Sequence, residues 1–195
     1  MRILLLHPPH IAIGSHIPKE NLPPLGLLCL GGPLIEAGHD VTLLNADLGP
    51  MPLAEIQTQI TEYAPDIVLV GHSGSTLAHP TVASIATTLK KNHPETIIIY
   101  GGVYPTYHWD DILRECPSID LIVHGEGEET LINLLSAPTT HSPLTTVNGI
   151  AYRQNGHPHA TPPAPVLADL DANRFGWELI DFDDYSYWGG RKSDL

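Results

Sequence analysis

The sequence predicts an α/β fold, a doubly wound five-stranded parallel sheet with helices on both faces. Two observations predict it. Short runs of apolar, β-branched residues recur along the chain, and such runs are typical of strands buried on both faces of a parallel sheet. Each run ends in a loop of Gly, Pro, Ser, Thr or His and is followed by a helical pattern, which is the alternation expected of this class.

The expected elements follow one another at spacings of about 25 to 40 residues, as in βα units. Right-handed crossovers then favour the strand order 2-1-3-4-5 of flavodoxin-like members of the Rossmann-like folds. Gly38 and Pro52 mark a helix end and a helix start. The expected strands are residues 2–7, 40–46, 67–70, 96–100 and 120–124, and the expected helices are residues 25–37, 52–63, 81–92, 105–115 and 128–135.

The composition changes after residue 137, so we expect residues 1–137 to form one domain and residues 138–195 to form a linker, a hairpin and an irregular tail. Asn155-Gly156 between two extended segments is a strong hairpin signal. The tail carries Trp177, Phe182 and further aromatic residues, which are too many apolar groups for a solvated segment. They require a surface to pack on, in this domain or in one that follows it.

The charge excludes some classes of partner. The net charge is −13 and only nine Lys and Arg are present, which argues against nucleic acids and anionic membranes as partners.

The cysteine count and the lengths of the apolar runs exclude other classes of protein. Two cysteines cannot build a disulfide framework or a Cys-rich metal site. No apolar run reaches the roughly 20 residues of a membrane span, and no signal-peptide pattern is present, so we expect a cytoplasmic protein.

Ligands of open α/β sheets bind outside the carboxyl ends of the strands, so the loops that follow the strands should share one site. Gly101 and Gly102 end the fourth strand without side chains, which allows another backbone or a bulky ligand to approach. Phosphate-binding motifs of the GxxxxGK[ST] type are absent, as is GxGxxG after the first strand. An FMN site would need its hydroxyl-rich loop after the first strand, whereas GHSGST follows the third.

Five motifs occur together in one order: HPP after the first strand, LPPLGLLCLGGPLIEAGHDV, GHSGST, IIIYGGVYPT and DLIVHGEGEETLINLL. In this combination the chain resembles the amino-terminal cobalamin-binding domain of radical S-adenosylmethionine (SAM) enzymes. It is most similar to the anaerobic magnesium-protoporphyrin IX monomethyl ester cyclase-like subfamily. The resemblance covers residues 1–137, and the hairpin and tail continue it as that family's interdomain linker.

The resemblance implies a slot for the nucleotide tail of cobalamin, lined by glycines, with hydroxyls that bind the polar groups of the tail. The ring would then rest over the loop of residues 8–24. Many cobalamin domains carry DxHxxG, whose His ligates cobalt. This chain lacks that motif, so we expect no metal-ligating residue, and His10 and His16 are the remaining candidates. The candidate cofactor-binding residues are Pro9, His10, His72, Ser73, Gly74, Ser75, Thr76, Gly101, Gly102, Val103, Tyr104, Gly125, Glu126 and Gly127.

The resemblance also implies a longer protein, an oxidoreductase or methyltransferase with SAM and a 4Fe-4S cluster in a carboxyl-terminal radical SAM domain. This chain has no CxxxCxxC, so we expect it to be a fragment that is not catalytic alone. Two alternatives stay open, a flavin or nucleotide domain of the same fold and a degenerate docking domain. Locally, the glycine pair could form only a turn, the hydroxyls could cap a helix, and the glutamates after the fifth strand could be helix amino-terminal charges.

Overall fold

Buried runs of Ile, Leu and Val form strands where the sequence predicts them. The computed structural model describes residues 1–9, 21–49, 51–72, 76–136, 144–169, 173–187 and 190–191. The main elements are β1 (Arg2–His7), α1 (Leu25–Glu36), β2 (Asp40–Asn45), α2 (Leu53–Tyr63), β3 (Ile67–His72), α3 (His79–Asn92), β4 (Ile97–Gly102), α4 (Val103–Glu115), β5 (Leu121–Val123), α5 (Glu128–Ser136), β6 (Ile150–Gln154) and β7 (His157–Ala160). Short elements are the 3-10 turns η1 (Thr76–Ala78), η2 (Leu144–Thr146), η4 (Trp177–Leu179) and η5 (Phe182–Asp184) and the strands β8 (Ser186–Tyr187) and β9 (Gly190–Arg191).

The first five strands are parallel in the expected order, and the hairpin extends the same sheet. The main sheet has the order β2-β1-β3-β4-β5-β6-β7, and β8 and β9 pair in a separate two-stranded sheet. β6 pairs antiparallel with β5, and Asn155 and Gly156 form the hairpin turn with positive φ values of 53° and 81°. β5 is only three residues long, and an unpaired edge of this kind is a liability. The hairpin therefore covers that edge and is continuous with the sheet.

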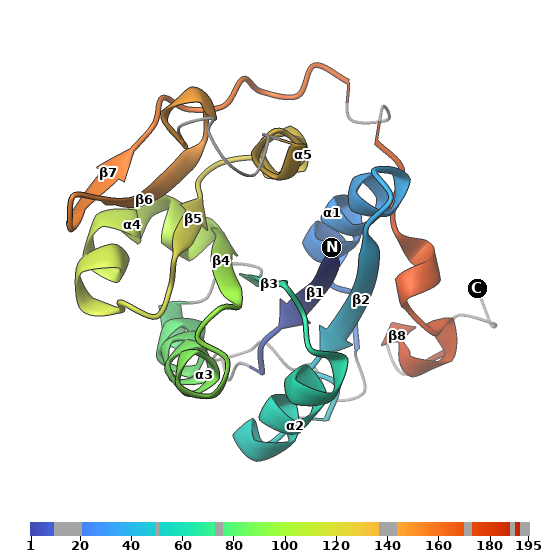
Figure 1. The fold of residues 1–195 in the computed structure, drawn as a ribbon. Helices are drawn as coiled ribbons and strands as arrows, with labels where there is room; N and C mark the ends of the chain where they lie inside the picture. The colour runs from blue at the N-terminus through green and yellow to red at the C-terminus, as the bar shows by residue number, and fades with distance from the viewer. Residues whose placement is uncertain are drawn as a thin grey trace.

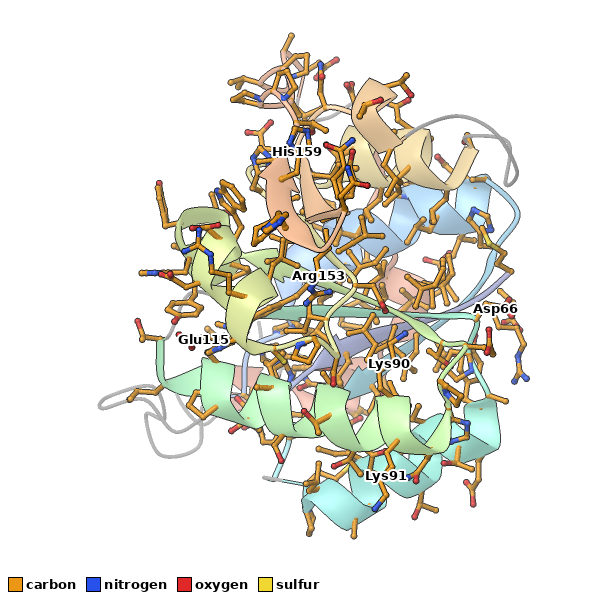
Figure 2. The ribbon with its side chains drawn as sticks, turned by 60° about the vertical axis from the view of Figure 1, so that its left-hand side comes forward. Asp66, Lys90, Lys91, Glu115, Arg153 and His159 are labelled. Atoms are coloured by element: carbon orange, nitrogen blue, oxygen red, sulfur yellow. The ribbon has the colours of Figure 1, made fainter. Side chains whose placement is uncertain are left out.

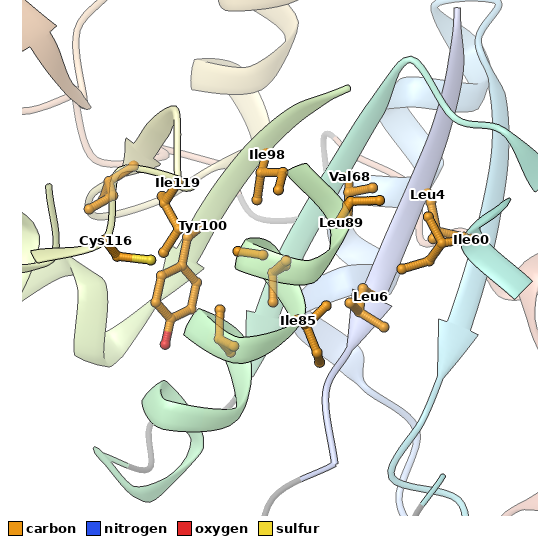
Figure 3. Packing of buried hydrophobic residues seen from close by; sticks show 14 of the residues in the cluster. Leu4, Leu6, Ile60, Val68, Ile85, Leu89, Ile98, Tyr100, Cys116 and Ile119 are labelled. Atoms are coloured by element: carbon orange, nitrogen blue, oxygen red, sulfur yellow. The ribbon is translucent and has the colours of Figure 1, made fainter. Parts of the chain in front are cut away.

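Helices cover both faces of the sheet, with α1 and α5 on one side and α2, α3 and α4 on the other (Figure 1). The side chains alternate accordingly along each strand. Leu4 and Leu6 pack toward α2 and α3, as Figure 3 shows, whereas Ile3 and Leu5 pack toward α1. Among the described residues, no helix has both the length and the apolar character needed to cross a membrane.

The tail packs on this domain and buries Tyr185, whereas Trp177 stays exposed. After β7 the chain crosses to the α1 side and runs beside α1 and β2 (Figure 1). The Gly176 N–H donates to the Leu28 carbonyl at 2.8 Å. A Cβ on Gly32 would overlap the carbonyl oxygen of Arg174, so the glycines of α1 permit the close approach. We call residues 173–187 the C-terminal strap.

Arg153 on β6 fixes the hairpin to α4 and the following loop (Figure 2). Its guanidinium donates to the carbonyls of Leu113, Cys116 and Ile119 at 2.9, 2.7 and 2.8 Å. These carbonyls lie at and beyond the end of α4, where a helix leaves acceptors without partners. We expect Arg153→Met to lower the free energy of unfolding by about 2–4 kcal/mol, measured by urea denaturation, because it removes charge-assisted hydrogen bonds to partly buried acceptors.

Arg114 is the matched control for Arg153. It pairs with Asp110 at 2.7 Å on the exposed surface of α4. An exposed pair of this kind is worth less than about 1 kcal/mol. If Arg153→Met lowered the free energy of unfolding no more than Arg114→Met does, the guanidinium of Arg153 would not hold the hairpin in place.

Candidate functional site

A cavity of about 770 Å³ lies at the carboxyl ends of the parallel strands. This volume lies within the range of about 300–1,000 Å³ typical of small-molecule and cofactor sites. The loops after β1 to β5 and the start of α1 and α5 contribute to it, as expected for an open α/β sheet. Its walls are His7, Asn21, Leu22, Pro23, Pro24, Leu25, Gly26, Leu27, Leu30, Asn45, Asp47, Leu48, Leu69, Val70, Gly71, His72, Ile99, Gly101, Gly102, Val123, Gly125, Glu126, Gly127, Glu128 and Leu131.

The deep part of the cavity is apolar and faces the α1 and α5 side of the sheet. Leu69, Ile99 and Val123 come from three neighbouring strands, and Leu27 and Leu131 come from the two helices opposite. These aliphatic walls offer few polar partners, so this part of the cavity suits an apolar part of a ligand.

The two glycines at the end of β4 have different roles. Gly102 has a φ of +109°, and a Cβ there would lie 2.7 Å from the carbonyl oxygen of His72. Gly102 is therefore required by the backbone itself. Gly101 has no such constraint: its Cβ would make only ordinary contacts of 3.8–3.9 Å with Val123, and Gly101 lines the cavity. Its missing side chain leaves space in the cavity rather than relieving a clash.

Thr106 on α4 ties the loops after β4 and β5 together. Its hydroxyl donates to the Gly102 carbonyl at 2.8 Å and accepts from the Gly125 N–H at 3.1 Å. A hydroxyl can do both at once, since it is a donor and an acceptor. Thr106 thus fixes the distance between two glycine-bearing loops that line the cavity.

A hydrogen-bond chain runs along the β1 and β2 side of the cavity. The Asp47 N–H donates to Asn45 Oδ1 at 3.3 Å, which identifies that atom as the amide oxygen. His7 Nδ1 must then donate to the same oxygen at 2.9 Å, and Asn45 Nδ2 donates to the Tyr185 hydroxyl at 3.1 Å. Burial raises the pKa of Tyr185, so the phenol stays neutral. The C-terminal strap therefore holds two cavity side chains in place.

The strap also holds the start of α1. Asn21 exchanges two backbone hydrogen bonds of 3.0 Å with Ser186. Asn21 lines the cavity next to the prolines that precede α1. Because the strap contacts both this segment and the end of β2, it braces one side of the cavity.

The charges around the cavity are negative or absent. Asp47, Glu126 and Glu128 line it, and no Lys or Arg is present among the described lining residues. A pyrophosphate or a phosphate dianion would be repelled by such walls unless cations compensated for them. The cavity thus suits a large ligand with little net negative charge.

Comparison with known proteins agrees with this geometry. The family model described as "B12 binding domain" matches residues 17–135. The chain belongs to the B12-binding domain family. This confirms cobalamin as the cofactor of the domain, and the residues present fit it, because the cavity offers apolar walls and a space that a side chain at Gly101 would fill.

Relatives of this B12-binding domain occur in larger proteins. The chain is 54% identical to the anaerobic magnesium-protoporphyrin IX monomethyl ester cyclase of Synechocystis sp. over 99% of its own length and 39% of the cyclase. It is 33% identical to the cyclase of the same description from Rubrivivax gelatinosus, over 96% of this chain and 34% of that protein. The expected similarity to the cyclase-like subfamily is therefore confirmed, and the chain spans well under half of these relatives.

Solved structures show the same fold. The cobalamin-dependent SAM radical enzyme OxsB with aqua-cobalamin bound superimposes with a TM-score of 0.68 at 24% identity, over 85% of this chain and 22% of that one. The methyltransferase TsrM from Kitasatospora setae, with cobalamin and a [4Fe-4S] cluster bound, gives 0.67 at 19% identity, over 89% of this chain and 31% of that one. The predicted α/β fold class is confirmed.

The structure of the B12-binding domain brings six of the predicted site residues to the cavity and places four elsewhere. Thr76 is exposed in η1, Val103 is exposed at the start of α4, and Pro9 lines a separate pocket of about 300 Å³ between α2 and α3. Tyr104 stacks on His108 of its own helix α4 and meets His79 of α3 at a tilted angle, away from the cavity. The six at the cavity are His72, Gly101, Gly102, Gly125, Glu126 and Gly127. Four predicted site residues lie outside the described part of the chain: His10, Ser73, Gly74 and Ser75. His16 lies outside it too. The expectation that no protein side chain ligates cobalt therefore stays a prediction.

Sequence reasoning missed several residues of the site. Thr106 lies within the IIIYGGVYPT motif, but nothing local marks its hydroxyl as a link to the next loop. Asn45 ends an ordinary strand, and Tyr185 belongs to a tail whose docking surface is far away in sequence. Glu128 could have been found, because it belongs to the same loop as three predicted residues.

Proposed function

We propose that this chain is the cobalamin-binding module of a cobalamin-dependent radical SAM enzyme, either of the tetrapyrrole ring cyclase type or of the C-methyltransferase type. The glycine-lined cavity at the carboxyl ends of the strands carries this proposal. The cyclase relatives support the first type, and a 28% identical hopanoid C-3 methylase from Methylococcus capsulatus supports the second. We further propose residues 1–137 as the binding domain and residues 138–195 as the link to a radical SAM domain.

The cavity would take the nucleotide tail, and the ring would lie at the mouth. Gly101 and Gly125 leave room for the tail between the strand ends, while Leu27 and Leu30 of α1 face its apolar base. Two of the lining side chains, Leu22 and Leu25, are apolar and exposed, and a flat macrocycle or a covering domain can bury them.

Bound cobalamin supplies cobalt for methyl transfer or one-electron chemistry, and this chain supplies binding and orientation. Thr106 holds the loops after β4 and β5 at a fixed separation, and the strap holds Asn45 and His7. SAM and the 4Fe-4S cluster belong, in this proposal, to the radical SAM domain of the full-length protein.

The negative walls favour cobalamin over the flavin or nucleotide alternative. FMN brings a phosphate dianion and NAD a pyrophosphate, whereas the tail of cobalamin has a single phosphodiester. Without Lys or Arg among the described lining residues, a dianion would face Glu126 and Glu128 with no compensating charge.

Incubation of the purified chain with hydroxocobalamin, FMN and NAD, followed by desalting and absorbance spectra, tests the proposal. We expect cobalamin to be retained at about one equivalent and the other two to be removed. Retention of FMN in place of cobalamin would support the flavin alternative. Retention of none of the three would contradict the proposal and favour a docking domain.

A further inference from the structure

The C-terminal strap is held to the domain by few buried groups. Among the strap side chains that the structure describes, only Tyr185 is a buried apolar group, and Leu179 is partly buried against the core. Further ties are backbone hydrogen bonds at Gly176 and Ser186 and an exposed ion pair between Arg174 and α1. Segments with few buried apolar contacts and exposed hydrogen bonds open at a lower free energy than the core does. We therefore expect the strap to open locally while the sheet stays folded.

The strap reaches the cavity through two lining residues. The Tyr185 hydroxyl accepts a hydrogen bond from Asn45 Nδ2, and Ser186 exchanges backbone hydrogen bonds with Asn21. Both asparagines line the cavity, and Asn45 Oδ1 in turn accepts from His7, a third lining residue. Opening of the strap therefore removes the partners that fix the side chain of Asn45 and the backbone of Asn21.

We propose that docking of the strap and binding of cobalamin are coupled, so that the bound cofactor holds the strap docked and the empty cavity lets it open; this rests on the proposed function. In the docked state the wall at Asn21 and Asn45 is ordered by the strap, and in the open state it is not. A cofactor that contacts the ordered wall binds the docked state more tightly. Such coupling is reciprocal, because the factor by which docking raises the affinity for cobalamin equals the factor by which cobalamin favours docking.

The coupling connects cofactor loading with a segment outside the matched domain. The strap follows residues 17–135, which match the B12-binding family model, and the chain spans only 39% of the Synechocystis cyclase. In the longer protein of the proposed function, the strap belongs to the link between two domains. A loaded cavity then fixes the start of that link, and an empty cavity leaves it free to move.

Hydrogen exchange followed by mass spectrometry, with and without hydroxocobalamin, tests the coupling. We expect saturating hydroxocobalamin to slow exchange in residues 173–187 by about 2- to 10-fold, the worth of one hydrogen bond. No described strap residue lines the cavity, so direct contact with the cofactor does not explain slower exchange. The edge strand β7 is the internal control, because it also follows the matched region and none of its residues is among the described lining residues. Its exchange should not change.

Gly32→Val gives a second, independent value for the same coupling. Its strap is displaced from α1, so its dissociation constant for hydroxocobalamin, from absorbance titration, reports the affinity of the open state. The ratio of this constant to that of the unaltered chain should equal the change in strap exchange. Tyr185→Phe loses only the hydroxyl that accepts from Asn45, and it should reduce the protection by cobalamin. Tyr107→Phe makes the same change on the exposed surface of α4 and should leave the protection as it is.

The outcomes separate this inference from the proposed function. Absence of cobalamin binding by the unaltered chain would overturn both. Cobalamin binding with unchanged exchange of the strap would overturn the inference alone. Equal slowing in the strap and in β7 would overturn it too, because binding would then stabilise the whole domain by mass action. The same holds if cobalamin protects the strap of Tyr185→Phe as strongly as that of the unaltered chain.

Discussion

Gly101→Leu is expected to abolish retention of cobalamin and to leave the fold intact. The Cβ position at Gly101 meets only Val123, at ordinary contact distances, so a larger side chain extends into the cavity instead of into the protein. We expect the dissociation constant to rise by at least about 100-fold, which corresponds to about 3 kcal/mol. Absorbance titration with hydroxocobalamin measures the affinity, and circular dichroism with thermal unfolding verifies the fold.

Two controls accompany this variant. Gly101→Ala adds one methyl group with ordinary contacts and should weaken binding much less. Thr87→Leu adds a leucine on the exposed surface of α3, away from the cavity, and should not affect binding. Full cobalamin affinity in Gly101→Leu would show that the cofactor does not enter beside β4.

Gly32→Val is expected to detach the C-terminal strap from α1. Any Cβ at this position overlaps the carbonyl oxygen of Arg174, and backbone cannot rotate away as a side chain can. We expect the free energy of unfolding to fall by about 2–4 kcal/mol in urea denaturation. Cobalamin affinity should fall by about 2- to 10-fold as well, because Asn45 loses its hydrogen bond to Tyr185.

Gly26→Ala is the matched control on α1. A Cβ at Gly26 meets nothing within 4 Å, and alanine favours a helix over glycine by about 1 kcal/mol. This variant should therefore be as stable as the unaltered chain or more stable. A Gly32→Val variant with the same free energy of unfolding as the unaltered chain would show that the strap does not depend on close contact with α1.

The sequence predicted the parts of the fold that depend on local patterns. The strands and the hairpin turn at Asn155-Gly156 follow from apolar runs and turn residues, and the order of the parallel strands follows from handed crossovers. Helix starts were predicted less precisely: α4 begins at Val103, two residues before the predicted Pro105, because Gly102 already turns the chain with a positive φ.

Features that depend on distant residues could not be predicted. The hairpin continues the sheet because β5 leaves an open edge, and β5 and the hairpin are separated by α5 and a linker. The sequence placed Gly101 and Gly102 in one motif but could not assign them different roles. Only the proximity of His72 shows that the backbone requires glycine at position 102. Likewise, only the packing of α5 shows that Glu128 lines the cavity while the adjacent Glu129 does not.

The position of the strap has a consequence for the order of events during synthesis. The bond from Asn45 to Tyr185 joins residues 140 positions apart, and the residue at its far end leaves the ribosome long after β1 and β2. Nascent domains fold from the amino terminus onward, so the sheet can assemble while the wall made by Asn21 and Asn45 still lacks its brace. Capture of cobalamin is therefore expected to follow translation of the C-terminal strap. A ribosome-bound chain that ends before residue 173 should release the cofactor faster than one that includes the strap.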